Sequence, residues 1–280
     1  MKKFRQKKSL GQHFLKDKNV VKKIADLAEI QENELVWEVG PGKGILTQEL
    51  LLQTNNLTCF EIDDSLYPIL IKKFGTNINL IGKDILKINW KEYLNNKQLK
   101  IVANLPYQIT SPFLFKVTEN AASFKRVVVM IQKEVAERIN AGVGTKDYGK
   151  LSLKMQFYFN VEYGFTVKPH LFIPPPKVDS AVIILTPRKD KPILEDEKSV
   201  KIIYTLLNNT SVTNSELNDN FSSNGLNLNH INREKNKFIN NLNIKLSSYL
   251  NQDFITREKD EYDKRMIIFK INKDLFRKQS

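Results

Sequence analysis

The sequence predicts an α/β protein: a doubly wound, mostly parallel sheet followed by a small helical C-terminal domain. Three observations predict this fold. Short apolar runs alternate with segments of helical spacing through the first two thirds of the chain, a glycine-rich turn follows the first run, and the composition changes after a charged, proline-bearing stretch at 187–197. Alternation of this kind is typical of parallel strands joined by helical crossovers.

The individual elements follow from hydrophobic spacing. Apolar residues at helical intervals predict a first helix over Asn19–Ala28. Five apolar runs predict the parallel strands: Leu35–Gly40, Leu57–Ile62, Ile78–Ile81, Ile101–Leu105 and Val127–Gln132. The segments between them with helical spacing include Ile45–Gln53, Ser65–Phe74 and Pro112–Asn120. Two further runs, Leu153–Phe159 and Ser180–Thr186, have no clear helix between them, so we predict an antiparallel hairpin at the sheet edge.

The chain is expected to have three parts. Residues 1–23 form a basic N-terminal arm, residues 24–187 carry the α/β domain, and residues 198–280 form a small helical domain. Beyond the linker, Asn becomes dense, with 14 in residues 208–251. Helical spacing persists in Val200–Leu207 and Phe238–Leu250, although Asn is a poor helix former.

Composition and charge restrict the class of protein. The 280 residues carry a net charge of +13, and residues 1–23 hold nine of the cations and a single anion. Such an arm favours a polyanionic partner, because each neutralised phosphate releases counterions. No apolar run is long enough to span a bilayer. The single cysteine, Cys59, excludes a disulfide scaffold and a cysteine-cluster metal site, which fits a cytoplasmic protein without a metal.

The first three predicted strands end at residues suited to a nucleotide-containing ligand. Glycines in Gly40–Gly44 allow the backbone to approach a ligand closely, and Glu61 lies 21 residues after Gly40, where α/β sheets place a carboxylate that accepts ribose hydroxyls. These signals fit a nicotinamide dinucleotide as well as S-adenosylmethionine. Asp84 offers an acceptor for an adenine amino group, but it would serve equally well as a helix N-cap.

Asn104-Leu105-Pro106-Tyr107 follows the fourth strand and suggests the reaction. The exocyclic nitrogen of adenine is a poor nucleophile because its lone pair is delocalised into the ring. Two acceptors, the Asn104 side-chain oxygen and the carbonyl of Leu105 or Pro106, would hold the amino hydrogens and aim the nitrogen at a methyl sulfonium. Tyr107 would stack on the base, because enzymes commonly hold a base that has left its helix against an aromatic side chain.

Six segments, taken in order, resemble the family of rRNA adenine N6,N6-dimethyltransferases of the KsgA type. They are Gly11–Leu15, Gly40–Gly44, Glu61, Asp84, Asn104–Tyr107 and Phe172–Ser180. The resemblance covers about residues 5–187. It implies a Rossmann-like, S-adenosylmethionine-dependent methyltransferase sheet. It also implies dimethylation of two adjacent adenosines near the 3′ end of small-subunit (16S) rRNA, with the 30S subunit or its precursor as partner and a monomeric enzyme.

The resemblance also assigns roles to individual residues. The residues implied to contact S-adenosylmethionine are His13, Leu15, Gly40, Glu61, Asp84 and Asn104. Catalysis is implied for Asn104, Leu105, Pro106, Tyr107 and Phe172. Tyr107 and Phe172 would sandwich the adenine, with Phe14 closing the methyl-donor side. For RNA phosphates, the candidates are Lys7 and Lys8 in the arm and Lys133 and Arg138 on a helix.

One departure from the family pattern keeps other functions open. The small lobe of the family usually begins with a Gln-Arg-Arg-Lys run, whereas Asn209–Val212 stands here without those cations. A non-catalytic ribosome assembly factor that keeps the fold is therefore one alternative. An Erm-type enzyme that methylates one adenosine of 23S rRNA is a second, and Phe172–Ser180 favours the small-subunit type over it. A nicotinamide oxidoreductase has no use for Asn104–Tyr107.

Overall fold

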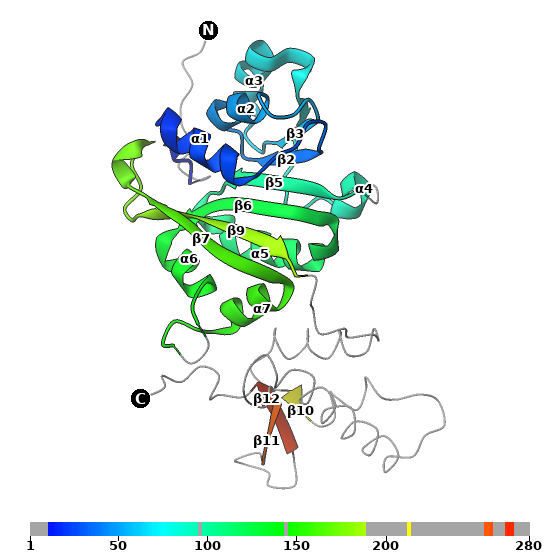
Figure 1. Ribbon diagram of the computed structural model, residues 1–280, viewed down its shortest axis with the longest axis vertical. Helices are drawn as coiled ribbons and strands as arrows, with labels where there is room; N and C mark the ends of the chain where they lie inside the picture. Colours follow the sequence, from blue (N-terminus) through cyan, green and yellow to red (C-terminus); the bar gives the residue numbers. More distant parts are fainter. Residues whose placement is uncertain are drawn as a thin grey trace. The chain divides into compact units, whose positions relative to one another are not determined.

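The computed structural model describes residues 11–94, 97–142, 145–188, 212–213, 255–259 and 267–271. Its main feature is a seven-stranded sheet with the order β4-β3-β2-β5-β6-β9-β7 (Figure 1). These strands are β2 (Val36–Val39), β3 (Leu57–Phe60), β4 (Asn79–Ile81), β5 (Leu99–Asn104), β6 (Phe124–Gln132), β7 (Phe159–Val167) and β9 (Ser180–Pro187). The first five pair in parallel, and β9 pairs antiparallel with both β6 and β7. The predicted α/β fold is confirmed.

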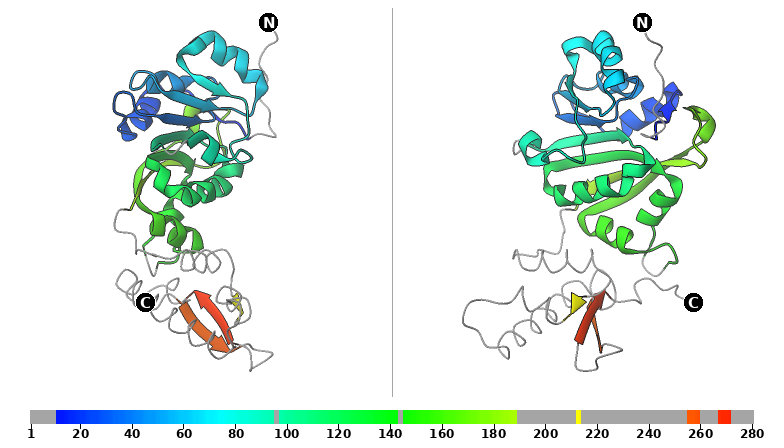
Figure 2. Two further views of the ribbon diagram at one scale, coloured as in Figure 1. Left: turned by 90° about the vertical axis from the view of Figure 1, so that its right-hand side faces the viewer. Right: turned by 180° about the vertical axis from the view of Figure 1, so that it is seen from behind.

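Helices cover both faces of this sheet (Figure 2). They are α1 (Lys18–Leu27), α2 (Ile45–Leu50), α3 (Tyr67–Phe74), α4 (Trp90–Leu94), α5 (Thr110–Glu119), α6 (Lys133–Ile139) and α7 (Lys150–Tyr158). Short 3-10 turns are η2 (Asp64–Leu66), η3 (Gly75–Asn77), η4 (Tyr107–Ile109), η5 (Ala121–Ser123) and η6 (Pro169–Leu171). The first helix begins where the sequence predicts, because the Asp17 carboxylate accepts the N–H of Val20 at 2.9 Å and caps it.

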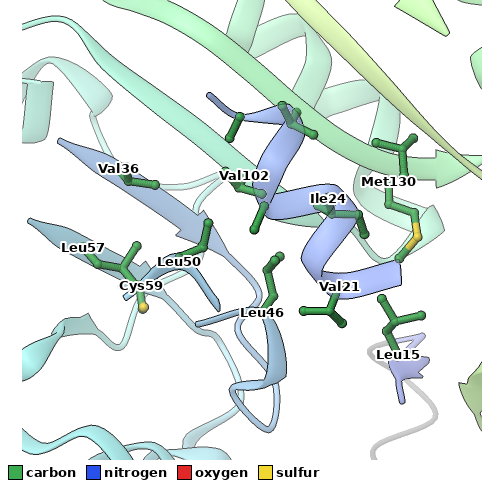
Figure 3. Close-up of a cluster of buried hydrophobic side chains, with 14 of the residues drawn as sticks. Leu15, Val21, Ile24, Val36, Leu46, Leu50, Leu57, Cys59, Val102 and Met130 are labelled. Carbon is green, nitrogen blue, oxygen red and sulfur yellow. The ribbon is translucent and has the colours of Figure 1, made fainter. Parts of the chain in front are cut away.

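Aliphatic side chains fill one face of the sheet. Helix α1 contributes Val21 and Ile24, and α2 contributes Leu46 and Leu50, all of them buried. They meet strand residues of the same face, as the close-up shows (Figure 3): Val36, Leu57, Cys59, Val102 and Met130. Both faces of the central strands are covered by helices, so these strands read as continuous apolar runs rather than alternating ones.

Aromatic side chains fill the opposite face. Trp37 of β2 lies edge-on to Phe60 of β3, with ring centroids 4.9 Å apart, and to Trp90 of α4 at 5.8 Å. The Trp90 ring also contacts Phe113 of α5 at 5.6 Å and Phe124 of β6 at 6.0 Å. Edge-to-face contacts of Trp90 hold α4 against the sheet, and a tilted ring contact joins α5 to α4.

The prediction of a strand over Leu153–Phe159 is wrong. Residues 150–158 form helix α7, and the antiparallel hairpin is instead made by β7 and β9. Apolar residues alternate with polar ones from Leu151 to Phe157, which is the period of a strand. In α7, however, four consecutive residues, 152–155, are buried, so no polar face remains to give the sequence a helical period.

Two small sheets lie outside the main one. β1 (Phe14–Leu15) pairs antiparallel with β8 (Phe172–Ile173) and so joins the N-terminal segment to the Phe172–Ser180 motif. A three-stranded sheet, β10-β12-β11, is made by Val212–Thr213, Ile267–Ile271 and Ile255–Lys259, and the sequence did not predict it. The helices expected at 200–207 and 238–250 lie outside the described residues.

By its internal contacts the chain divides into two compact units, residues 1–140 with 155–188, and residues 141–154 with 189–280. Folded structure begins inside the expected arm, since β1 and the start of α1 precede residue 23. Among the described residues, no helix is both long and apolar enough to cross a membrane.

Candidate active site

A pocket of about 500 Å³ opens at the carboxyl ends of the parallel strands. The chain leaves β2 towards β3 on one side and returns to β5 on the other, and open α/β sheets bind ligands at such a switch point. The lining includes every residue predicted to contact the cofactor or to act in catalysis: His13, Leu15, Gly40, Glu61, Asp84, Asn104, Leu105, Pro106, Tyr107 and Phe172. Its volume lies within the usual range of small-molecule sites.

The glycine turn between β2 and α2 forms one wall of the pocket. Gly42 has φ +58°, and a Cβ there would lie 2.9 Å from the Phe14 ring. Gly44 has φ +75°, and a Cβ there would clash with the Phe74 ring. Both positions therefore need glycine for the backbone conformation and for close packing. The Phe14 ring of β1 thus packs closely against Gly42 at the pocket wall.

Glu61 lies directly after β3 and is only 5% exposed. Its Oε2 accepts the N–H of Gly42 at 3.1 Å and its Oε1 accepts that of Asp63 at 2.9 Å, which fixes the carboxylate against the glycine turn. Burial raises the pKa of Glu61, and the neighbouring Asp63 charge adds to the rise. Asp84 accepts the N–H of Leu86 at 2.9 Å and also lines the pocket. It can therefore cap the turn and still contact a ligand.

The Asn104 amide is oriented by the N-terminal segment. Its Nδ2 lies 3.4 Å from the His13 carbonyl and donates to it, which leaves Oδ1 as the acceptor. The sequence left open whether Leu105 or Pro106 supplies the second acceptor. The Pro106 carbonyl accepts the N–H of Ile109, whereas we find no hydrogen bond to the Leu105 carbonyl among the described residues. This difference favours Leu105.

The aromatic residues of the pocket are held by contacts from distant parts of the chain. The Tyr107 hydroxyl lies 2.8 Å from Ser180 Oγ, and the His13 ring stacks on Tyr107 with centroids 5.8 Å apart. His13 Nδ1 lies 2.8 Å from the Pro174 carbonyl and donates to it. Phe172 lines the pocket but is 3% exposed and packs within the hydrophobic core. Its ring is thus much more enclosed than that of Tyr107, which is half-buried.

Sequence reasoning missed Glu38, a charged residue in the middle of strand β2. It lines the pocket, is 1% exposed, and its Oε1 has no hydrogen-bond partner. The Cys59 thiol donates to its Oε2 at 3.6 Å. The available signal was a lone carboxylate inside an apolar strand, Val36–Val39, since buried charges are costly without a function. Among the described residues, no group of His, Cys, Asp or Glu is arranged to hold a metal ion.

We expect Glu38 to make the stability of the protein fall as pH rises. Burial, assisted by the charge of Glu61, raises the pKa of Glu38 from 4.5 to about 7. Between these values the folded protein keeps a proton that the unfolded chain releases, so the free energy of unfolding drops by up to about 3 kcal/mol from pH 4.5 to 7. Denaturant unfolding at pH 5 and pH 8 measures this fall in the free energy of unfolding.

Glu38→Gln should remove this dependence, so that the variant gains stability relative to the parent as pH rises. Glu32→Gln removes an exposed carboxylate five residues past the end of α1. It serves as the matched control and should leave the dependence unchanged. Equal slopes for the parent and Glu38→Gln between pH 5 and 8 would assign the proton to another group.

The predicted RNA contacts are not brought together in the pocket. Lys133 and Arg138 lie on α6, where they pair with Glu137 at 3.5 Å and Glu134 at 2.9 Å respectively. Both cations are partly exposed, and ion pairs at such positions are weak enough to exchange for a phosphate. Lys7 and Lys8 lie outside the described residues.

Two solved structures with a similar fold are an rRNA methyltransferase and a dimethyladenosine transferase. The chain matches the 23S rRNA methyltransferase ErmE with a TM-score of 0.59 and 29% identity, over 70% of this chain and 77% of that one. It matches a dimethyladenosine transferase from Plasmodium falciparum with a TM-score of 0.60 and 25% identity, over 86% and 82%. The fold and the pocket together define an S-adenosylmethionine-dependent methyltransferase.

The sequence identifies the family within this class. Residues 3–256 match the family described as ribosomal RNA adenine dimethylase, and the chain belongs to it. It is therefore an rRNA adenine dimethyltransferase with S-adenosylmethionine as methyl donor, and the resemblance seen in the sequence is confirmed.

Curated relatives agree with this assignment. A protein of Ligilactobacillus salivarius is 44% identical over 203 residues, which cover 70% of this chain and 69% of the relative. A protein of Streptococcus gordonii is 45% identical over 202 residues, which cover 69% of each chain. A protein of Clostridium perfringens is 43% identical over 207 residues, which cover 73% of this chain and 72% of the relative. All three are named ribosomal RNA small subunit methyltransferase A.

Proposed function

We propose that this enzyme methylates N6 of two adjacent adenosines near the 3′ end of 16S rRNA and gives N6,N6-dimethyladenosines during small-subunit biogenesis. Its partner is the 30S subunit or its precursor, and it acts as a monomer in the cytoplasm. The observation that carries the proposal is the position of Asn104–Tyr107, which lines the same pocket as Glu61 and Asp84. Relatives named for the small subunit, at up to 45% identity, favour that subunit over the large one.

The methyl donor occupies the part of the pocket between the glycine turn and the acidic residues. Gly40 allows the backbone to approach the donor. Glu61 accepts hydrogen bonds from the ribose hydroxyls, and Asp84 accepts one from the adenine amino group. His13 and Leu15 close this side from the N-terminal segment. A buried carboxylate with an unpartnered oxygen, Glu38, suits the same region, because a cationic donor offers it hydrogen bonds and charge. When bound, S-adenosylmethionine would supply an electrophilic methyl group, and S-adenosylhomocysteine would leave as the sulfur–methyl bond breaks.

The target adenine occupies the part of the pocket next to Tyr107. Asn104 Oδ1 and the Leu105 carbonyl accept the two amino hydrogens, which draws the nitrogen lone pair out of the ring and aims it at the methyl carbon. Pro106 shapes the turn that presents this carbonyl. Tyr107 and Phe172 flank the base. The rate acceleration comes from positioning and from acceptors oriented in advance, and the product ammonium loses its proton to solvent.

Methyl transfer to small subunits whose rRNA lacks these modifications tests the proposal. Labelled S-adenosylmethionine is the donor, the modified position is mapped, and the methyl count is read by mass. Adjacent dimethyladenosines in the 3′-terminal hairpin are the expected result. Label on 23S rRNA would favour an Erm-type activity, and tight subunit binding with no label would favour an assembly factor that keeps the fold.

RNA phosphates are proposed to bind Lys7 and Lys8 in the basic arm and Lys133 and Arg138 on α6. We expect Lys7→Ala/Lys8→Ala to weaken RNA binding and to flatten its salt dependence by up to about 2 in the log–log slope, because each lost phosphate contact contributes slightly less than 1. Affinity for S-adenosylmethionine should stay at the parental value. The measurement is RNA affinity at several salt concentrations.

The matched control for the arm is Lys87→Ala/Lys91→Ala, which removes the same charge from two exposed residues outside the pocket lining. A general loss of positive charge would affect both double variants alike. Equal salt slopes for the two would therefore refute a specific role for the arm.

A further inference from the structure

The Tyr107 ring stands on a short turn, η4, that leads directly into α5. Tyr107 is the first residue of η4, a three-residue turn whose N-cap, Pro106, provides no side-chain hydrogen bond. The ring is only half-buried. A side chain with two rotatable bonds on such a turn has no fixed plane unless other residues hold it. Stacking on a base needs a fixed plane, since small misplacements of reacting groups cost about 100-fold in rate.

Ser180 lies on a strand that is paired on both sides. It is the first residue of β9, where its backbone pairs with Gln132 of β6 on one side and with Val167 of β7 on the other. Its side chain is 1% exposed and lines the pocket. The residue that precedes it is fixed as well, because the Asp179 carbonyl accepts the N–H of Lys133 at 3.0 Å. The hydroxyl of Ser180 therefore has a well-defined position.

The two hydroxyls meet at 2.8 Å, although 73 residues separate them in the chain. The rest of β9 is apolar through residue 185, so a hydroxyl at its buried start would be costly without a partner. Tyr107 supplies that partner at the tip of its ring. The stacked His13 ring contacts Tyr107 as well, so the ring is held by residues from two other segments of the chain.

We propose that Ser180 is a positioning residue that fixes the plane of the Tyr107 ring for stacking on the target adenine. The inference rests on the proposed function and deepens it, because it assigns a role to a residue that the proposed mechanism does not use. Orientation of Tyr107 before the base arrives lowers the cost of ordering the complex.

The test compares Ser180→Ala, Tyr107→Phe and the double variant in single-turnover methyl transfer to unmodified small subunits. We expect Ser180→Ala to lower the rate roughly 10- to 100-fold while the Kd for S-adenosylmethionine stays within about twofold. Tyr107→Phe breaks the same bond, so the double variant should be no slower than the slower single variant. Ser180→Thr keeps a hydroxyl and should restore most of the rate.

The control is Thr166→Val. Its hydroxyl lies 2.7 Å from the Tyr163 hydroxyl, a similar pair on β7 in which neither residue lines the pocket. Thr166→Val should keep the parental rate. A Ser180→Ala rate within twofold of the parent, multiplicative effects of the two single variants, or an equal loss in Thr166→Val would each overturn the inference.

A second readout needs no RNA. The rotation rate of the Tyr107 ring, followed by NMR of tyrosine-labelled protein and assigned with Tyr107→Phe, should rise in Ser180→Ala and stay unchanged in Thr166→Val. A parental enzyme that fails to methylate small subunits would count against the proposed function alone. An unchanged ring rotation in Ser180→Ala would count against the positioning role.

Discussion

Asn104→Ala is expected to lower kcat for adenine methylation roughly 100- to 1000-fold, the cost of removing one oriented group that stabilises charge in a transition state. The Asn104 amide nitrogen donates to the His13 carbonyl, so Oδ1 remains to accept an amino hydrogen of the base. Alanine removes that acceptor, and the nitrogen lone pair stays delocalised in the ring. The measurement is single-turnover transfer with saturating donor and small subunits.

The fold should survive this substitution. Asn104 is half-buried, and the bond that it loses is long, at 3.4 Å, so we expect an unfolding midpoint within about 4 °C of the parent. Asn79→Ala is the matched control, because this exposed asparagine on β4 also donates at 3.4 Å, to the hydroxyl of Thr58. Near-parental turnover of Asn104→Ala would refute the proposed catalytic role.

Glu61→Gln is expected to weaken S-adenosylmethionine binding roughly 10- to 100-fold at pH 8, the usual cost of one or two hydrogen bonds to a charged group. Both carboxylate oxygens already accept backbone N–H groups, from Gly42 and Asp63. A glutamine must turn its NH2 group towards one of these donors. The glycine turn then loses the bond that holds it beside the cofactor site.

The pH dependence of binding gives a second test of Glu61. Burial raises the pKa of Glu61, so this carboxylate takes up a proton at a higher pH than an exposed glutamate does. As the solution is acidified, the parent should therefore begin to lose affinity for S-adenosylmethionine at that higher pH. The variant has no such proton, and its affinity should change less over the same range. Calorimetric titration from pH 5.5 to 8.5 measures both proteins.

Glu92→Gln is the control for this experiment, because Glu92 is an exposed carboxylate on α4 that accepts the Asn89 amide at 3.0 Å outside the pocket. It should bind the donor as the parent does. If Glu61→Gln matched this control in affinity and in pH profile, the ribose contact would have to be assigned to another residue.

The sequence predicted the parallel strands and the site residues that follow them well. Apolar runs placed β2, β3, β5 and β6 to within a few residues, because strands buried on both faces are predominantly apolar. The prediction around 153–159 was wrong because apolar and polar residues alternate there as in a strand, although the middle of α7 is buried and has no polar face. A buried helix and a buried strand cannot be separated by periodicity alone.

The sequence by itself determined the class of the protein, its family and the residues that end each strand at the site, because these depend on local patterns: hydrophobic runs, a glycine turn and short motifs in a fixed order. Only the tertiary structure decided how the site is held together. The contacts of His13 with Tyr107 and Pro174, and the bond between Tyr107 and Ser180, join residues 73 or more positions apart in the chain. Such contacts follow from strand order and register, which periodicity does not encode.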